Sequence, residues 1–107
     1  MTEEQKAICH KIADHYGEEH QMLKAVEEMA ELAQVIIKAV NDPPKDRFYA
    51  ETLKDEFLSE LADVIIMTEQ LVKFVSDNDC MSDLIGMIKS KLNRQLERME
   101  CENDEQT

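Results

Sequence analysis

Residues 19–40 read EHQMLKAVEEMAELAQVIIKAV, with apolar side chains at intervals of three and four. This spacing is typical of an amphipathic helix, which makes one turn about every 3.6 residues. The next four residues, Asn41-Asp42-Pro43-Pro44, end the pattern, because proline lacks the amide hydrogen that a helix interior needs. We therefore predict a long helix over residues 19–40.

Three more helical segments are predicted on either side of this one. The first covers residues 2–16 and ends at Gly17, because a residue without a Cβ atom suits the end of a helix. The third covers residues 46–75 and the fourth residues 80–99, and the polar cluster Ser76-Asp77-Asn78-Asp79 between them is typical of a turn or a helix cap. The chain is therefore predicted to be all-α, a four-helix bundle-type unit with one short and three long helices.

The composition favours a small, acidic, helical domain. The 107 residues include 24 Asp and Glu against 12 Lys and Arg, a formal net charge of −12, and only two Gly and two Pro, which argues against a turn-rich sandwich or barrel. The negative charge argues against binding of duplex nucleic acid or an anionic membrane, since both need basic patches, and it suits a protein that collects divalent cations. A chain of this length forms one domain, which we place at residues 1–101, followed by a flexible acidic tail at residues 102–107.

The three cysteines, Cys9, Cys80 and Cys101, indicate neither a disulfide framework nor a zinc site, because their number is odd and no C-x-x-C pair occurs. Reduced thiols are typical of the cytosol. The beginning of the chain lacks the basic and apolar segments of a signal peptide, and the longest aliphatic runs, at residues 35–37 and 64–67, are too short to cross a bilayer. We expect a cytoplasmic protein that does not enter a membrane.

Two acidic pairs, Glu28-x-x-Glu31 and Glu60-x-x-Asp63, lie in the second and third predicted helices. A spacing of three places both members of a pair on one face of a helix. At about 100° per residue, Glu60 falls in the middle of the apolar stripe of its helix, with Asp63 on the flank, and the first pair borders the stripe of its own helix. A solvated surface glutamate is not expected at such a position.

Acidic pairs on a solvated face are common and cost little, and Glu27 and Glu69 fit that description because they point away from the apolar stripes. Carboxylates gathered at an apolar face, by contrast, cost several kcal/mol per ion unless they share protons or bind a cation. Lys24 is the obvious basic neighbour, and one lysine does not neutralise four acids. A site of carboxylate oxygens alone suits Mg²⁺ or Mn²⁺ rather than zinc.

Histidine does not contribute to a predicted metal site. His10, His15 and His20 recur every five residues, so that successive imidazoles do not share a helix face, and we expect ordinary surface or boundary residues. A ferritin-like di-iron bundle needs Glu-x-x-His pairs, which neither acidic motif contains. A carboxylate-bridged redox site is therefore disfavoured.

The two acidic motifs in their apolar context resemble a known family. KAVEEMAEL at residues 24–32, followed by SELADVI at residues 59–65, resembles the signature of the MazG-like all-α nucleoside triphosphate pyrophosphohydrolases, which is E-x-x-E, a spacer, and E-x-x-D on adjacent helices. The resemblance extends over residues 17–94. It includes the lead-in residues and a K-x-x-x-N-R stretch like that on the last helix of single-domain members: Tyr16, Gly17, Gln21, Lys89, Asn93 and Arg94.

The resemblance implies a Mg²⁺-dependent enzyme, with Mn²⁺ as a substitute, that cleaves a nucleoside or deoxynucleoside triphosphate to the monophosphate and pyrophosphate, in house-cleaning of the nucleotide pool. Carried over residue by residue, it implies that the metal-binding and catalytic residues are Glu28, Glu31, Glu60 and Asp63. It further implies that the residues that contact the substrate are Lys24, Lys89, Asn93 and Arg94.

The predicted helices have apolar residues on more than one side, as Val35 and Ile37 illustrate in the second helix. Such broad apolar coverage in a short chain indicates packing against another subunit. Relatives in the resembled family build their sites in dimers or tetramers, so we expect a homodimer or a homotetramer. The alternative function is a non-catalytic helical interaction or regulatory module of the same fold. Such a module is expected to lack one or more of the four motif acids. The base, the sugar, the attacked phosphorus and the number of metal ions stay open.

Overall fold

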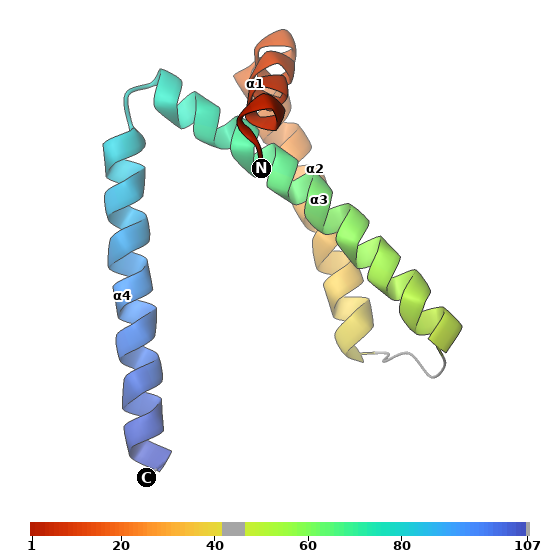
Figure 1. The fold of residues 1–107 in the computed structure, drawn as a ribbon, viewed down its shortest axis with the longest axis vertical. Helices are drawn as coiled ribbons and strands as arrows, with labels where there is room; N and C mark the ends of the chain where they lie inside the picture. Colours follow the sequence, from red (N-terminus) through yellow and green to blue (C-terminus); the bar gives the residue numbers. More distant parts are fainter. Residues whose placement is uncertain (42–46, 107) are drawn as a thin grey trace. The chain divides into compact units, whose positions relative to one another are not determined.

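The computed structural model of the chain describes residues 1–41 and 47–106, and these form four helices and no strand. In chain order the helices are α1 (Glu3–Tyr16), α2 (Glu18–Asn41), α3 (Arg47–Asp77) and α4 (Met81–Gln106), as Figure 1 shows. Their lengths are 14, 24, 31 and 26 residues. The prediction of an all-α chain with one short and three long helices is confirmed.

Helix α1 has a defined signal at each end. The Gln5 amide donates to Thr2 Oγ1 at 3.1 Å and the Thr2 amide donates to Gln5 Oε1 at 3.0 Å, which is a capping box. At the other end Gly17 adopts φ 90°, a conformation that side chains with a Cβ atom disfavour, and its amide donates to the Ala13 carbonyl at 2.8 Å. The predicted helix end at Gly17 is confirmed.

The ends of α2 and α3 agree with the predictions to within a few residues. Helix α2 ends at Asn41 and α3 begins at Arg47. The rest of the predicted breaker, at residues 42–44, and the predicted start at Asp46 lie outside the described residues. Helix α3 continues to Asp77, two residues beyond the predicted end, and a turn follows in which Asp79 has φ 58° and the Cys80 amide donates to the Val75 carbonyl at 3.0 Å.

Helix α4 is longer than predicted. It continues to Gln106, so the predicted end near residue 99 is wrong, and the acidic residues 102–106 extend the helix. Glutamate and glutamine are good helix formers, and exposed final turns need no apolar partner to continue. The chain groups into two compact units, residues 1–74 and residues 75–107. The single domain at residues 1–101 stays a prediction, because neither unit is shown to fold without the other.

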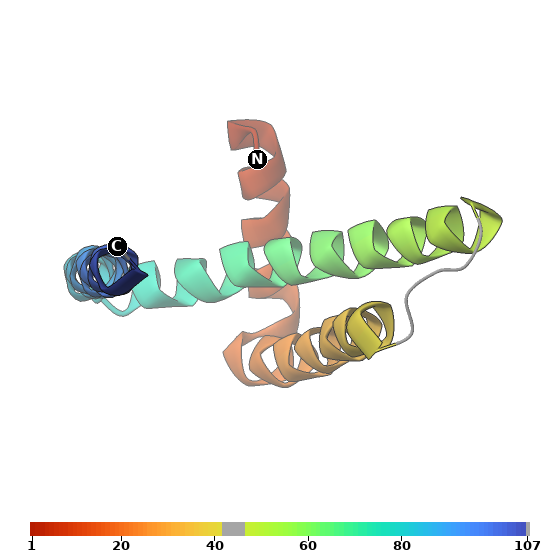
Figure 2. The same ribbon diagram turned by 90° about the horizontal axis from the view of Figure 1, so that it is seen from below.

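In the first unit, α2 and α3 lie side by side and antiparallel, and α1 crosses them (Figures 1 and 2). Two contacts show the antiparallel order, since the start of α2 meets the end of α3 and the end of α2 meets the start of α3. The Gln21 amide group donates to Gln70 Oε1 at 2.6 Å, and Lys38 Nζ lies 3.8 Å from Glu56 Oε2. The buried apolar side chains come from all three helices: Cys9, Ala13, Ala25, Leu53, Met67 and Phe74.

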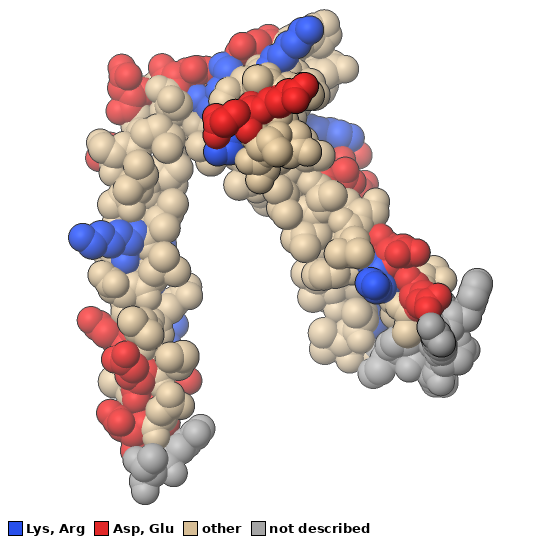
Figure 3. Space-filling view, in the orientation of Figure 1, with Lys and Arg blue, Asp and Glu red and all other residues tan. Residues whose placement is uncertain are grey.

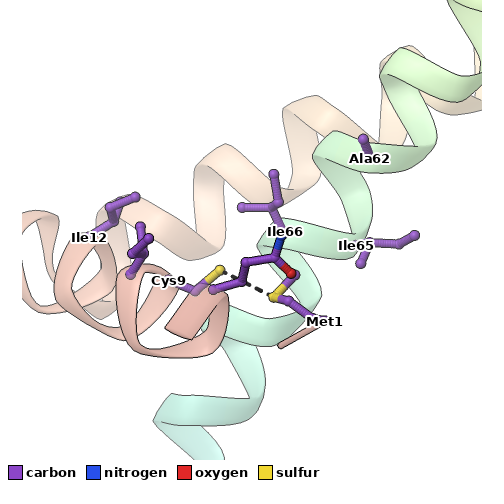
Figure 4. Close-up of a pocket in the computed structure, with 8 residues that line it drawn as sticks. Met1, Cys9, Ile12, Ala62, Ile65 and Ile66 are labelled. Atoms are coloured by element: carbon purple, nitrogen blue, oxygen red, sulfur yellow. Dashed lines mark hydrogen bonds between the residues drawn. The ribbon is translucent and has the colours of Figure 1, made fainter. Parts of the chain in front are cut away.

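Large apolar side chains are exposed in both units. Figure 3 shows that each unit also has wide surfaces without Lys, Arg, Asp or Glu. In the first unit, α1 and α3 border an apolar cavity of about 400 Å³, where the Cys9 thiol donates to Met1 Sδ at 3.7 Å (Figure 4). Its lining is Met1, Gln5, Ile8, Cys9, Ile12, Ala62, Ile65 and Ile66. In the second unit, α4 exposes Ile85, Ile88, Leu92, Leu96 and Met99. None of the described helices combines the length and apolar character that a membrane span requires.

Candidate metal centre

Three carboxylates from two helices meet in the first unit. Glu28 of α2 and Glu60 and Asp63 of α3 each offer one oxygen, and these oxygens lie within 4.8 Å of one another. Glu28 is 9% exposed, and Glu60 and Asp63 are half-buried. The cluster forms because α2 and α3 are antiparallel, and because Glu60 and Asp63 are one turn apart on the face of α3 that meets α2.

Two oxygens of this acidic cluster lack a partner within the described part of the chain. Glu28 Oε2 and Glu60 Oε2 are buried and accept no hydrogen bond there. An unpaired buried carboxylate oxygen is costly, since it has lost water without gaining a donor or a cation. A hard divalent cation with oxygen ligands would supply the missing interaction, so the donor set fits Mg²⁺ or Mn²⁺.

Lys24 partly compensates the charge of the cluster. Its Nζ lies 3.3 Å from Glu28 Oε1, one turn away on α2, and 3.4 Å from Glu27 Oε2. The hydrogen bond to Glu28 raises the pKa of Lys24, and the charge of Glu27 raises it further, so the ammonium stays charged. Because Lys24 is shared between Glu27 and Glu28, it does not balance the three carboxylates of the cluster, and a divalent cation would offset the excess negative charge.

Glu31, the fourth predicted ligand, is half-buried and lies beside the cluster rather than within it. It lines a cavity of about 320 Å³ between α2 and α3. The other lining residues are Gln34, Val35 and Lys38 of α2 and Glu56 and Glu60 of α3. Because Glu60 belongs to both the acidic cluster and the lining, the cavity opens directly beside the cluster.

The predicted substrate contacts on the last helix are on α4, in the second unit. Lys89, Asn93 and Arg94 are all exposed there. Their contribution to the acidic cluster stays a prediction. Lys24, the fourth predicted substrate contact, lies beside the cluster and already pairs with two glutamates.

The prediction for Glu69 is wrong, because α1 covers that part of α3. Glu69 Oε1 lies 3.0 Å from His10 Nε2, and its side chain is 21% exposed rather than solvated. Angles within one helix could not reveal this contact, since it depends on where a different helix packs. His15 and His20 are exposed, as expected, and their rings pack against Tyr16. Among the described residues, no group able to hold a metal ion includes a histidine.

A buried amide pair was not predicted as a pair. Gln21 is 4% exposed and Gln70 is 2% exposed, and the two are joined by the 2.6 Å hydrogen bond between α2 and α3. His20 Nδ1 also lies 2.7 Å from Gln21 Oε1. The sequence does contain a hint of this pair. Gln21 is seven residues before Glu28 and Gln70 is seven residues after Asp63, so each amide shares a helix face with an acid of the cluster.

Comparison of the chain with family models, curated proteins and solved structures gives no match. The acidic cluster, the cavity beside it and the sequence motifs that supply their residues are therefore the features from which a function is inferred.

Proposed function

We propose that the chain is a Mg²⁺-dependent nucleoside triphosphate pyrophosphohydrolase of the MazG-like type. It would cleave a nucleoside or deoxynucleoside triphosphate to the monophosphate and pyrophosphate. The observation that supports this most directly is the acidic cluster of Glu28, Glu60 and Asp63, with two buried oxygens that have no partner among the described residues. A partly buried cluster with excess negative charge is suited to hold a divalent cation against a polyphosphate.

The roles of the residues follow from their positions. Glu28, Glu60 and Asp63 would hold the metal, and Glu31, beside the cluster, is available to complete the ligand set or to accept a proton from the attacking water. When bound, Mg²⁺ supplies charge neutralisation of the triphosphate and activation of that water, and Mn²⁺ would substitute for it. Lys24, whose Nζ lies 3.3 Å from Glu28 Oε1, would orient the Glu28 carboxylate.

The remaining expectations belong to the same proposal. Lys89 and Asn93 would contact phosphate or sugar oxygens, and Lys24 and Arg94 would do so as weaker contacts. The exposed apolar side chains of both units support assembly into a homodimer or homotetramer, because a lone chain would leave them in water. The setting would be the cytoplasm, with nucleotide-pool house-cleaning as the role.

A nucleotide panel tests the proposal. Purified protein is incubated with ribo- and deoxyribonucleoside triphosphates, including modified bases, with Mg²⁺, with Mn²⁺ or with EDTA. Monophosphate and pyrophosphate are measured together. We expect equal amounts of both products from at least one nucleotide, and none with EDTA. Absence of pyrophosphate across the panel would refute the enzyme and leave the alternative, a non-catalytic helical interaction module, for which the exposed apolar side chains are the supporting observation.

A further inference from the structure

We propose that Lys38 binds the pyrophosphate part of the substrate in the cavity beside the acidic cluster. This inference depends on the proposed function and adds a residue to it, since neither acidic motif includes Lys38. The cavity is formed by one face of α2 and one face of α3, both in the first unit. Lys38 is the one cationic residue among the described residues that line it.

The position of Lys38 relative to the cluster follows from helix geometry. Glu31, Gln34 and Lys38 follow one another at intervals of three and four on α2, so their side chains share a face and all three line the cavity. Lys38 is two turns beyond Glu31, which corresponds to about 10 Å along the helix axis. The Lys38 ammonium lies 3.8 Å from Glu56 Oε2, and Glu56 precedes Glu60 of the cluster by one turn on α3.

The lining of the cavity favours phosphate over the nucleoside. Its volume of about 320 Å³ lies at the lower end of the range for ligand sites, so it would hold part of a nucleotide. Val35 is the one apolar side chain among the described residues of the lining, and that lining has no aromatic ring on which a base could stack. Gln34 and Lys38 supply hydrogen-bond donors, which phosphate oxygens accept.

The charge of the cavity explains why the cation and the polyphosphate would bind together. Glu31, Glu56 and Glu60 contribute three carboxylates against the ammonium of Lys38. A free polyphosphate would be repelled by this excess of negative charge, whereas a polyphosphate that arrives with a divalent cation would not. Lys38 then supplies a fixed positive charge at the end of the cavity away from Glu28.

The ion pair between Lys38 and Glu56 is weak enough to be exchanged for a phosphate contact. Its distance of 3.8 Å is long, and the two side chains are 49% and 45% exposed. An exposed pair of this kind contributes little to stability, whereas a charge-assisted hydrogen bond between lysine and phosphate is among the stronger polar contacts. In this inference Glu56 holds Lys38 at the mouth of the cavity and competes with phosphate for its ammonium.

The test compares Lys38→Ala with Lys54→Ala as a matched control. Lys54 is exposed on α3 and outside the cavity lining, so both variants lose one positive charge and only one loses the cavity lysine. Steady-state hydrolysis is measured with the best nucleotide of the panel. Binding of inorganic pyrophosphate in the presence of Mg²⁺ is measured by calorimetry, with circular dichroism to verify folding.

For Lys38→Ala we expect KM and the dissociation constant of pyrophosphate to rise about tenfold or more, as expected for loss of a charge-assisted contact, with kcat less affected. Lys54→Ala should keep the wild-type values, and Glu56→Gln should bind pyrophosphate more tightly because one carboxylate that competes for the Lys38 ammonium is lost. Equal values in Lys38→Ala and Lys54→Ala, or failure of the wild type to bind pyrophosphate with Mg²⁺, would overturn the inference. A wild type that hydrolyses no nucleotide but binds pyrophosphate through Lys38 would refute the proposed enzyme and support the phosphate site.

Discussion

Replacing Glu60 with glutamine should make the metal-free protein more stable and remove its response to Mg²⁺. The side chain keeps its size, and the cluster loses one negative charge. Glu60 lies within 4.8 Å of carboxylate oxygens of both Glu28 and Asp63. Its buried Oε2 accepts no hydrogen bond from the described residues, so no such bond to this oxygen is lost on substitution. The substitution therefore relieves repulsion with little loss of contact.

The size of the effect follows from the geometry. At 4.8 Å and an effective dielectric constant near 20, each pair of like charges costs about 3.5 kcal/mol, and Glu60 takes part in two such pairs. Lys24 offsets Glu28, and water and salt screen the half-buried Glu60 and Asp63. We therefore expect the free energy of unfolding to rise by about 1–2 kcal/mol, at the modest end of single-substitution effects. For a domain of this size that corresponds to a rise in Tm of roughly 5–10 °C.

The assay is thermal unfolding followed by circular dichroism, in EDTA and in saturating Mg²⁺. In EDTA the Glu60→Gln variant should have the higher Tm. In Mg²⁺ the order should reverse, because a ligand at about 100 times its dissociation constant stabilises the wild type by about 2.7 kcal/mol and the variant lacks a metal ligand. Asp55→Asn is the matched control, since Asp55 is exposed on the same helix and outside the cluster.

Two results would refute the reasoning. A Glu60→Gln variant with a lower Tm than the wild type in EDTA would show that the carboxylate is stabilised by its surroundings. An equal gain from Mg²⁺ in the variant and the wild type would show that Glu60 is not a ligand. Hydrolysis by the variant at the wild-type rate would contradict the catalytic assignment as well.

The remaining predictions concern the reactivity of the thiols, Gly17 at the end of α1, and the assembly of the chain. With a thiol reagent at pH 8, Cys80 and Cys101 should react quickly and Cys9 slowly, because burial, and then the charge of Glu69, raise the pKa of the Cys9 thiol; three equally fast thiols would contradict the packing of α1. Gly17→Ala should lower the free energy of unfolding by about 1 kcal/mol, because φ 90° is unfavourable for alanine, and an unchanged Tm would contradict the assigned helix end. Light scattering at micromolar concentration should give at least twice the chain mass of 12.4 kDa, and a monomer would show that the exposed apolar faces need no partner.

The fold was predictable where one helix at a time determined the outcome. Apolar spacing, Gly17 and the Asn-Asp-Pro-Pro breaker predicted four helices and most of their ends. The α4 end was missed because a polar helix can continue after its apolar pattern stops. Glu69 was misassigned for a related reason, since its burial comes from contact with His10 of another helix and no periodicity within α3 reports that contact.

The acidic cluster was also predictable in part, and what could not be predicted was the packing of one helix against another. Helical angles identified four acids at apolar borders, but the distances between helices decide which of them meet, and the structure brings together Glu28, Glu60 and Asp63 while Glu31 lines the neighbouring cavity. Lys38 was missed because a lysine near the end of a helix has no distinctive spacing. Its significance appears only once α3 places Glu56 and Glu60 opposite.

The buried amide pair accounts for the register that makes the cluster. Gln21 precedes Glu28 by seven residues on α2, and Gln70 follows Asp63 by seven residues on α3, so each amide lies two turns from a carboxylate of the cluster. In antiparallel helices these equal spacings mean that the hydrogen bond between Gln21 and Gln70 brings Glu28 opposite Asp63. Repulsion between the carboxylates opposes that arrangement, whereas a shift of α2 along α3 would break the hydrogen bond between the two buried amides. The amide pair therefore holds together a set of charges that would otherwise separate, which is what a preorganised cation site requires.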